Sequence, residues 1–286
     1  MRGIVLAGGL GSRLRPVTTA INKHLLNVSN KPMIYYPMST LMLAGIRDIL
    51  IISTPESISL FEKLFEDGSS LGLRIDYAIQ HKSNGIADAF KVAKKFSRYE
   101  KIALILGDNI FHGTELGRYL SKYTEISGAQ IFAYEVNSPK DYGVIEIDDF
   151  GNAKSLEEKP QNPKSKLAVT GLYFFDEKAN YYVDELKPSA RGELEITDLN
   201  MIYLNKGELK VKVLPRGTMW LDMGTFENLY SAASYIKTVE ERQGHQIACL
   251  EEISLNQGWI KANQIKKRIE YFSGTDYGNY LRRVLK

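Results

Sequence analysis

Cysteine and histidine are scarce in this sequence. Among 286 residues there is one cysteine, Cys249, and the four histidines stand at positions 24, 81, 112 and 245. A single cysteine excludes a disulfide framework within the chain and a zinc site built from thiolates. The histidines show no paired metal-ligand spacing. The sequence therefore predicts neither a disulfide-stabilised domain nor a histidine-bound metal.

An excess of charge of one sign is also absent. Lysine and arginine number 37 and aspartate and glutamate number 34, so the net charge is +3. This charge is too small to predict binding to nucleic acid or to an anionic membrane surface. No run of apolar residues is long enough to span a bilayer, and the first residues lack the pattern of a signal peptide. We therefore expect a cytoplasmic protein without nucleic-acid or membrane partners.

The first half of the chain instead alternates strand-like and helix-like segments. The expected strands are 4–7, 48–53, 73–80 and 101–106, and the expected helices are 56–66 and 85–97. Strands then dominate at 129–135, 142–148, 153–158 and 167–175, and helices return at 195–205, 225–242 and through most of 251–286. This order predicts an α/β fold, with a Rossmann-like mixed, mainly parallel sheet flanked by helices. We expect an α/β domain over residues 1–242 and a helical C-terminal extension over residues 243–286.

A glycine-rich turn follows the first strand. It comprises Gly8, Gly9, Gly11, Ser12 and Arg13. Glycines leave the backbone N–H groups open to a ligand, and the forked guanidinium of Arg13 suits a phosphate. Neither the G-x-G-x-x-G fingerprint of dinucleotide-binding proteins nor the P-loop motif is present. With Lys23 close behind, the turn predicts a polyphosphate site at the carboxyl end of the first strand.

Two aspartates follow apolar runs that are far apart in the sequence. The apolar run 102–106 is followed by one glycine and then by Asp108, and Asp222 directly follows Met219-Trp220-Leu221. Each aspartate alone is equally consistent with a helix cap or a turn. Together, at strand ends of an open α/β sheet, they could converge on one Mg²⁺, which prefers oxygen ligands.

The ends of two other predicted strands carry polar groups suited to a nucleotide base and a phosphate. Gln80 offers an amide donor and acceptor to a pyrimidine edge, and Gly85 leaves room for the base. Lys159 stands between Glu158 and the turn-forming Pro160. Thymine and uracil differ by one methyl group, which an apolar pocket distinguishes by only about 1–3 kcal/mol. These residues therefore predict a pyrimidine without choosing between the two.

Five ordered blocks resemble the sugar-1-phosphate nucleotidylyltransferase family, and within it the branch that joins dTTP to glucose 1-phosphate. The resemblance covers nearly the whole chain. The blocks are 7–16 with Lys23 and Lys31-Pro32-Met33, Leu106-Gly107-Asp108-Asn109, Glu157-Glu158-Lys159-Pro160, residues 191–198, and Trp220-Leu221-Asp222 with Gly224-Thr225.

The resemblance implies roles for the matching residues. The glycine turn, Arg13 and Lys23 would hold the triphosphate together with Asp108, and Gln80 and Gly85 would read the base. Asp108 and Asp222 would bind the catalytic Mg²⁺. Lys159 would contact the sugar phosphate and Glu158 a sugar hydroxyl. The remaining sugar-phosphate contacts implied are Gly143, Val169 and Arg191.

The resemblance also implies the reaction. Glucose 1-phosphate would attack the α-phosphate of dTTP in line and release pyrophosphate, as a step of deoxysugar biosynthesis of the rhamnose type. No general base is needed, because the attacking phosphate oxygen is already an anion at pH 7. Members of this branch are homotetramers with a feedback nucleotide-sugar inhibitor, so we expect both here.

Some residues depart from the family pattern. The family usually has glutamine and proline where this chain has His24 and Asn27, threonine at Ser12, and a proline-containing loop at residues 81–84. We expect His24 and Asn27 beside the nucleotide. They leave open two alternatives, a related enzyme that prefers UTP and a non-catalytic nucleotide-sugar-binding regulatory subunit. A nicotinamide-dependent oxidoreductase is disfavoured by the glycine spacing.

Overall fold

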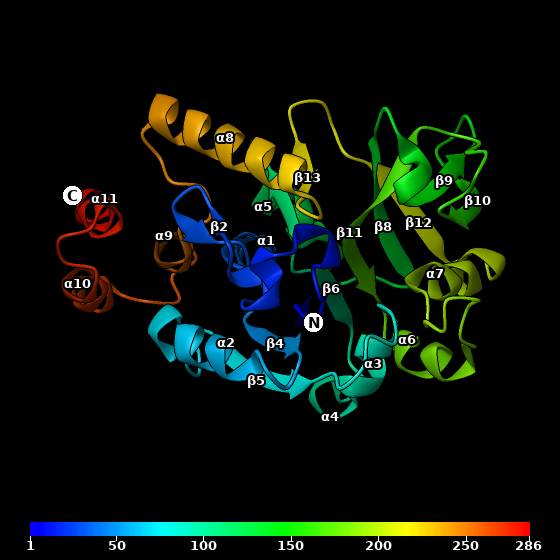
Figure 1. Ribbon diagram of the computed structural model, residues 1–286, viewed down its shortest axis with the longest axis horizontal. Helices are drawn as coiled ribbons and strands as arrows, with labels where there is room; N and C mark the ends of the chain where they lie inside the picture. The colour runs from blue at the N-terminus through cyan, green and yellow to red at the C-terminus, as the bar shows by residue number, and fades with distance from the viewer.

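A nine-stranded sheet runs through the molecule, which the computed structural model describes over residues 1–286 (Figure 1). Its strands are β1 (Arg2–Leu6), β4 (Asp48–Ser53), β5 (Arg74–Ile79), β6 (Ile102–Leu106), β8 (Ala129–Glu135), β9 (Gly143–Ile147), β10 (Ala153–Glu158), β11 (Leu167–Phe175) and β12 (Leu209–Val213). Two short antiparallel pairs lie outside this sheet. They are β2 (Asn27–Val28) with β3 (Lys31–Pro32), and β7 (Asn109–His112) with β13 (Met219–Asp222).

The strand order places the first half of the chain in a parallel block. The main path is β10-β9-β11-β6-β1-β4-β5, with β8 between β11 and β12. The neighbours β6, β1, β4 and β5 are parallel, whereas β11 is antiparallel to β6 and to β8. The predicted Rossmann-like, mixed α/β sheet is confirmed.

Alternation along the central strands divides the core between the two faces of the sheet. Val5 of β1 and Ile51 of β4 belong to one buried cluster, and Ile4 and Leu50 belong to the other. Successive side chains of a strand point to opposite faces, so a strand that is apolar throughout must be covered on both sides. Helices therefore flank the sheet on each face, as Figure 1 shows.

The helices are short except for α8. They are α1 (Tyr35–Leu43), α2 (Ile58–Phe65), α3 (Asp88–Val92), α4 (Lys94–Ser97), α5 (Leu116–Leu120), α6 (Ala179–Tyr182), α7 (Ile196–Asn205), α8 (Phe226–Gln243), α9 (Leu250–Asn256), α10 (Ala262–Tyr271) and α11 (Asp276–Val284). The helix predicted over 85–97 is two short helices that start later. The first residues of the predicted range are not helical, because the Ala87 N–H donates to the Leu194 carbonyl at 3.1 Å instead of to a carbonyl within the helix.

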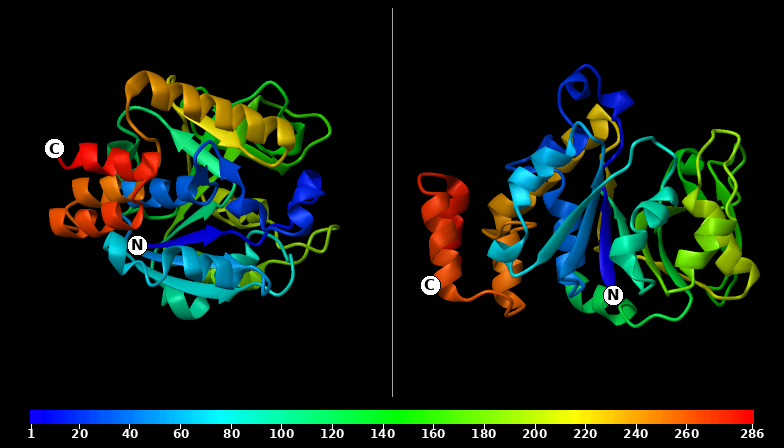
Figure 2. Two further views of the ribbon diagram at one scale, coloured as in Figure 1. Left: turned by 60° about the vertical axis from the view of Figure 1, so that its left-hand side comes forward. Right: turned by 90° about the horizontal axis from the view of Figure 1, so that it is seen from below.

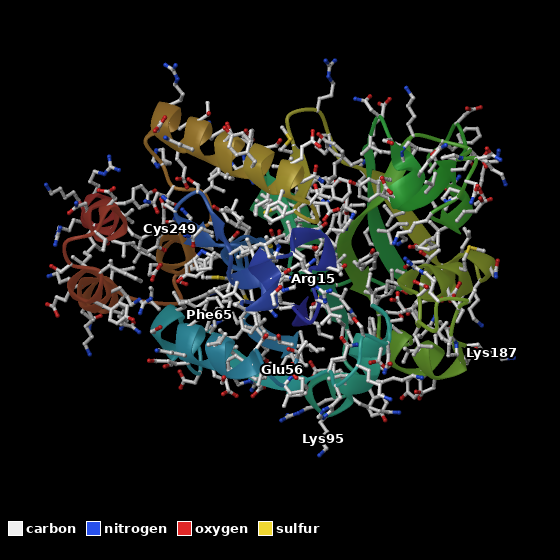
Figure 3. All side chains as sticks on the ribbon, viewed as in Figure 1. Arg15, Glu56, Phe65, Lys95, Lys187 and Cys249 are labelled. Carbon is white, nitrogen blue, oxygen red and sulfur yellow. The ribbon has the colours of Figure 1, made fainter.

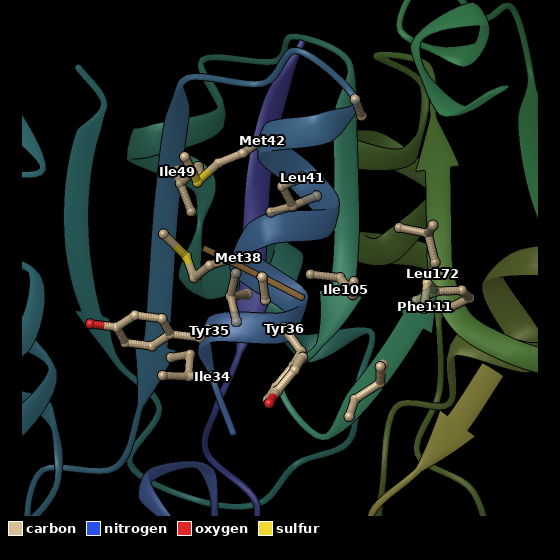
Figure 4. Close-up of a cluster of buried hydrophobic side chains, with 14 of the residues drawn as sticks. Ile34, Tyr35, Tyr36, Met38, Leu41, Met42, Ile49, Ile105, Phe111 and Leu172 are labelled. Carbon is tan, nitrogen blue, oxygen red and sulfur yellow. The ribbon is translucent and has the colours of Figure 1, made fainter. Parts of the chain in front are cut away.

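The central helix α1 was not predicted, since it has no polar face. Eight of its nine residues are buried. Met38 and Met42 of this helix extend toward β4, where Met42 lies beside Ile49 (Figure 4). A helix covered on all sides loses the 3.6-residue alternation that reveals amphipathic helices.

The last three helices pack at one end of the molecule. Figure 2 shows α10 and α11 on the side opposite β9 and β10. Cys249, labelled in Figure 3, lies in a small buried cluster with Tyr280 and Leu281 of α11. Burial raises the pKa of this thiol to about 12. We retain residues 1–242 and 243–286 as a proposed division, with α8 ending at Gln243. None of the helices is both long and apolar enough for a membrane crossing.

One buried ion pair joins the N-terminal part of the chain to α8. Lys31 of β3 is 2 % exposed, and its ammonium lies 2.9 Å from a carboxylate oxygen of Glu240. The same carboxylate accepts hydrogen bonds from Asn30 Nδ2 at 3.2 Å and from the Ile247 N–H at 2.9 Å. Glu240 therefore ties β3, the end of α8 and the segment before α9 to one another.

We predict that Glu240→Ala lowers the free energy of unfolding by about 3–5 kcal/mol, because it leaves the Lys31 ammonium buried without its counter-charge. Glu241→Ala is the matched control. Glu241 is exposed and lies 3.8 Å from Lys237, so its removal should cost less than about 1 kcal/mol. Urea denaturation of both variants measures the difference, and equal losses would contradict the prediction.

Candidate functional site

Two adjoining clefts open beside the carboxyl ends of β1 and β6. One, the glycine-loop cleft, is lined by residues that include Gly8, Gly9, Lys23, His24, Gln80, Gly85 and Arg191. The other, the Asp222 cleft, is lined by residues that include Arg13, Gly143, Val169, Thr197, Asn200, Trp220 and Asp222. Both clefts share Asp108, Glu158 and Lys159 with Ile86, Leu106 and Ile196. Thirteen of the fifteen predicted site residues thus lie around one continuous depression, and Gly11 and Ser12 line neither cleft.

The glycine turn is shaped for close approach of the backbone. Gly11 has φ +58°, and a Cβ there would lie 2.9 Å from Thr18 Cγ2. A Cβ at Gly9 would meet Lys23 Cε at 3.1 Å. Only glycine adopts the Gly11 conformation without strain, and the turn therefore keeps Lys23 close to the backbone after β1.

Gln80 presents a fixed acceptor to the glycine-loop cleft. Its Nε2 donates to Asp88 Oδ2 at 2.8 Å, so its Oε1 is turned toward Gly8, where an added Cβ would lie at 3.2 Å. Gly85 has φ +100°, and a Cβ there would lie 2.4 Å from the Leu194 carbonyl oxygen. Glycine is required at position 85 by this close passage of two backbone segments.

The carboxylate of Asp108 is held by two neighbouring side chains. Lys23 Nζ donates to its Oδ2, and Asn109 Nδ2 donates to its Oδ1 at 3.0 Å. Burial opposes ionisation of this carboxyl, but the Lys23 ammonium and these hydrogen bonds outweigh it and lower its pKa to about 2. Asp108 is therefore a carboxylate at every pH at which the protein would function.

Asn109 connects this aspartate to the rest of the sheet. Its Oδ1 accepts hydrogen bonds from Trp220 Nε1 at 2.6 Å and from the Gly171 N–H at 3.0 Å. A Cβ at Gly171 would lie 2.6 Å from the same oxygen, so glycine is needed there. One buried amide thus links β7, β13 and β11 and orients Asp108.

Asp222 faces Asp108 from the neighbouring strand. The ladder between β7 and β13 pairs Asn109 with Asp222, directly after Asp108. Burial, followed by the charge of Asp108, raises the pKa of Asp222 to about 6. The guanidinium of Arg13 lies nearby, since its Nη2 would be 2.5 Å from a Cβ at Gly224 and Asp222 Oδ1 3.4 Å from the same point.

The two facing carboxylates fit a hard divalent cation. Burial and their mutual repulsion raise the pKa of Asp222, and a positive ion bound between the two carboxylates would relieve that repulsion. No group of three or more histidine, cysteine, aspartate or glutamate side chains is placed to hold a metal. The two aspartates would supply two carboxylate ligands, and phosphate and water would fill the remaining positions. This set of oxygen ligands suits Mg²⁺ and differs from the histidine and cysteine ligands of a zinc site.

Lys159 and Glu158 stand where the two clefts meet. Lys159 has φ +44°, a left-handed conformation that is costly for a residue with a Cβ and that is concentrated at functional sites. Glu158 Oε2 accepts a hydrogen bond from the Thr197 hydroxyl at 2.6 Å, and its Oε1 lies 3.4 Å from Arg191 Nη2. Arg191 also donates to Glu195 at 2.8 Å. It lines the glycine-loop cleft rather than the Asp222 cleft, where Gly143 and Val169 lie.

His24 and Asn27, which depart from the family pattern, differ in their position relative to the clefts. His24 is 1 % exposed and lines the glycine-loop cleft, and its Nδ1 lies 2.8 Å from Asn22 Oδ1. Burial and the charge of Lys23 lower its pKa to about 3, so the ring is neutral. Asn27 is exposed in β2 and lines neither cleft, which corrects its predicted place beside the nucleotide.

Several cleft residues were missed by the sequence analysis. They are Asn109, Tyr142, Tyr173, Thr197, Asn200 and Trp220. Asn109, Thr197 and Trp220 belong to the motif blocks that resemble the family, but the sequence indicated no role for them. Asn200 lies three residues after Thr197 on α7, and this helical spacing was the only available signal.

Comparison with known proteins agrees with this geometry. The family model described as nucleotidyl transferase matches residues 2–239. Glucose-1-phosphate thymidylyltransferases of Neisseria gonorrhoeae and of Mycobacterium tuberculosis (strain CDC 1551 / Oshkosh) are each 50 % identical to this chain over 286 residues. Each alignment covers 100 % of this chain and 99 % of the relative.

Solved structures share the fold. A Bacillus anthracis chain solved in complex with a sucrose has 41 % identity and a TM-score of 0.76, over 82 % of this chain and 94 % of that chain. A UDP-glucose pyrophosphorylase complexed with UDP-glucose has 24 % identity and a TM-score of 0.73, over 83 % and 98 %, and shows the fold alone. With the family model covering most of its length and relatives matching it from end to end, the chain belongs to the nucleotidyl transferase family.

Proposed function

We propose that this nucleotidyl transferase joins dTTP to α-D-glucose 1-phosphate, giving dTDP-glucose and pyrophosphate. The observation that carries the proposal is the convergence of Arg13, Lys23, Asp108, Lys159 and Asp222 on two connected clefts. These residues come from segments far apart in the sequence. The glucose-1-phosphate thymidylyltransferases that match the whole chain carry the same activity in their names.

The glycine-loop cleft is the proposed nucleotide site. Gln80 Oε1 would accept the N3–H of a pyrimidine, because its Nε2 is already bonded to Asp88. The backbone of Gly8 and Gly9 would face the phosphates, and Lys23 would neutralise part of their charge. Thymine and uracil both carry an N3–H, so this contact excludes cytosine but not uracil. A UTP-preferring enzyme is therefore the second candidate.

The Asp222 cleft is the proposed site of the sugar phosphate. Lys159, at the junction of the clefts, would align the attacking phosphate, and Glu158 would accept from a sugar hydroxyl. Asp108 and Asp222 would hold Mg²⁺, and a bound ion of this kind neutralises charge that develops on the phosphates. The guanidinium of Arg13, beside Asp222, would also neutralise charge on the phosphates. The neutral His24 ring is a poor base, which agrees with a reaction whose nucleophile is already charged.

The remaining expectations belong to the same proposal. We infer a cytoplasmic homotetramer with a feedback nucleotide-sugar inhibitor, as the family resemblance implies. The non-catalytic regulatory subunit is disfavoured, because Arg13, Lys23, Asp108, Lys159 and Asp222 are all retained and line the clefts.

Release of pyrophosphate tests the function directly. The purified protein is incubated with Mg²⁺, each of dTTP, UTP, dCTP and ATP, and each of glucose, galactose and mannose 1-phosphate. We expect the highest kcat/KM with dTTP and glucose 1-phosphate, about 10-fold to 100-fold above UTP if an apolar contact reads the methyl group. A UTP maximum would favour the second candidate. Binding of dTDP-glucose with no turnover of any pair would refute an enzyme.

Asp222→Asn should lower kcat by about 100-fold or more and raise the Mg²⁺ concentration needed for half-maximal rate, because one of two metal-binding carboxylates is lost. Asp198→Asn is the matched control. Asp198 is exposed on the first turn of α7 and lines neither cleft, so its rate should stay within about 2-fold of wild type. Normal metal dependence in Asp222→Asn would remove Asp222 from the metal site.

Gln80→Leu should lower kcat/KM for dTTP by about 10-fold or more and reduce the preference for dTTP over dCTP, because the N3–H loses its acceptor. The measurement is competition between the two nucleotides at fixed glucose 1-phosphate. The KM for glucose 1-phosphate should not change. An unaltered dTTP-to-dCTP ratio would show that the base is read elsewhere.

A further inference from the structure

Asn200 lies in the Asp222 cleft without a hydrogen-bond partner for its side-chain oxygen. This residue of α7 is 1 % exposed, and its Oδ1 makes no bond within the protein. It lines the cleft together with Leu156, Val169 and Tyr173. A buried amide without a partner destabilises the folded chain, and buried polar groups are for that reason nearly always paired. The position of Asn200 is therefore explained by a partner from outside the chain.

The polar groups next to Asn200 are already engaged with one another. Thr197 lies one turn earlier on the same face of α7, and its hydroxyl donates to Glu158 Oε2 at 2.6 Å. The other Glu158 oxygen lies 3.4 Å from Arg191 Nη2. These bonds fix the wall of the cleft around Glu158. They leave the side-chain oxygen of Asn200 as an unpaired acceptor on the same helix face.

We propose that Asn200 is a specificity-determining residue whose side-chain amide bonds one ring hydroxyl of the hexose 1-phosphate. This inference rests on the proposed function. A hydroxyl both donates and accepts, so it pairs with either end of the amide. The apolar Leu156 and Val169 in the same cleft suit the C–H face of a sugar ring. The ligand class is hexose 1-phosphates that carry a hydroxyl at the position facing Asn200.

Asn180 provides a matched control. It is also a buried asparagine on a short helix, 3 % exposed, with an unpaired Oδ1. Its Nδ2 donates to the carbonyls of Glu100 at 3.2 Å and Glu177 at 3.1 Å, and it lines neither cleft. Its amide therefore serves the fold, and its replacement should leave substrate choice unchanged.

The experiment compares wild type, Asn200→Leu, Asn200→Ala and Asn180→Leu. Initial rates are measured with dTTP and with glucose 1-phosphate or its 2-, 3-, 4- and 6-deoxy analogues. Both Asn200 variants should lose about 10-fold to 100-fold in kcat/KM for glucose 1-phosphate, with the KM for dTTP within about 2-fold of wild type. One of the deoxy analogues should have a lower kcat/KM than glucose 1-phosphate with wild type, and this difference should disappear in the Asn200 variants. Asn180→Leu should show the same loss of kcat/KM as wild type with each deoxy analogue.

Thermal unfolding without substrates gives an independent readout. Asn200→Leu should not lower the midpoint, because it removes an unpaired polar group and adds a stronger helix former. Asn180→Leu should lower it, since two carbonyls lose their donor. Unchanged kcat/KM, or the same penalties with all four analogues, in the Asn200 variants would overturn the inference. A wild type without turnover of glucose 1-phosphate and dTTP would instead overturn the proposed function.

Discussion

The rest of the site depends on two carboxylates, the buried Asp108 and the half-buried Asp222, being held close to each other. Asp108 and Asp222 repel, and burial together with this repulsion raises the pKa of Asp222. Their approach is enforced by the ladder between β7 and β13 and by Asn109, whose amide bonds Trp220, Gly171 and Asp108 at once. Lys23 compensates one charge. The other makes the clefts attractive to cations, and the neighbouring glycine turn and Arg13 make them attractive to polyphosphates.

Buried, paired strands support the two carboxylates. The parallel strands β1, β4 and β6 are apolar on both faces and buried between helices, so the turns at their carboxyl ends start from fixed points. Positive φ angles occur beside the clefts at Gly11, Gly85 and Lys159, and also at turns elsewhere, such as Ser29 and Glu115. Rigid strands and a few demanding turns together place side chains from both halves of the chain in one depression.

Sequence alone was sufficient for much of this arrangement. Strands 48–53, 129–135, 153–158 and 167–175 were predicted with the bounds that the structure has, because each is a long apolar or alternating run. Helix α1 was missed because it is buried on all sides, and the β7–β13 ladder because its strands are short and about a hundred residues apart. The motif blocks located the charged residues. Asn200 was not predicted because its unpaired side-chain oxygen is a property of the folded chain and leaves no pattern in the sequence.

The ladder between β7 and β13 also has a bearing on how this protein can diverge. The spacing of Asp108 and Asp222 is set by strand register, and the long intervening chain contributes to it through Gly171, whose N–H holds Asn109. Exposed turns of that chain, such as residues 149–152, can therefore lengthen or shorten without disturbing the acidic pair. A slip of one residue in β13 would be far more severe, since it would turn Asp222 to the opposite side and present Leu221 in its place. Insertions are thus tolerable in the exposed turns between these strands and intolerable in the four residues of β13.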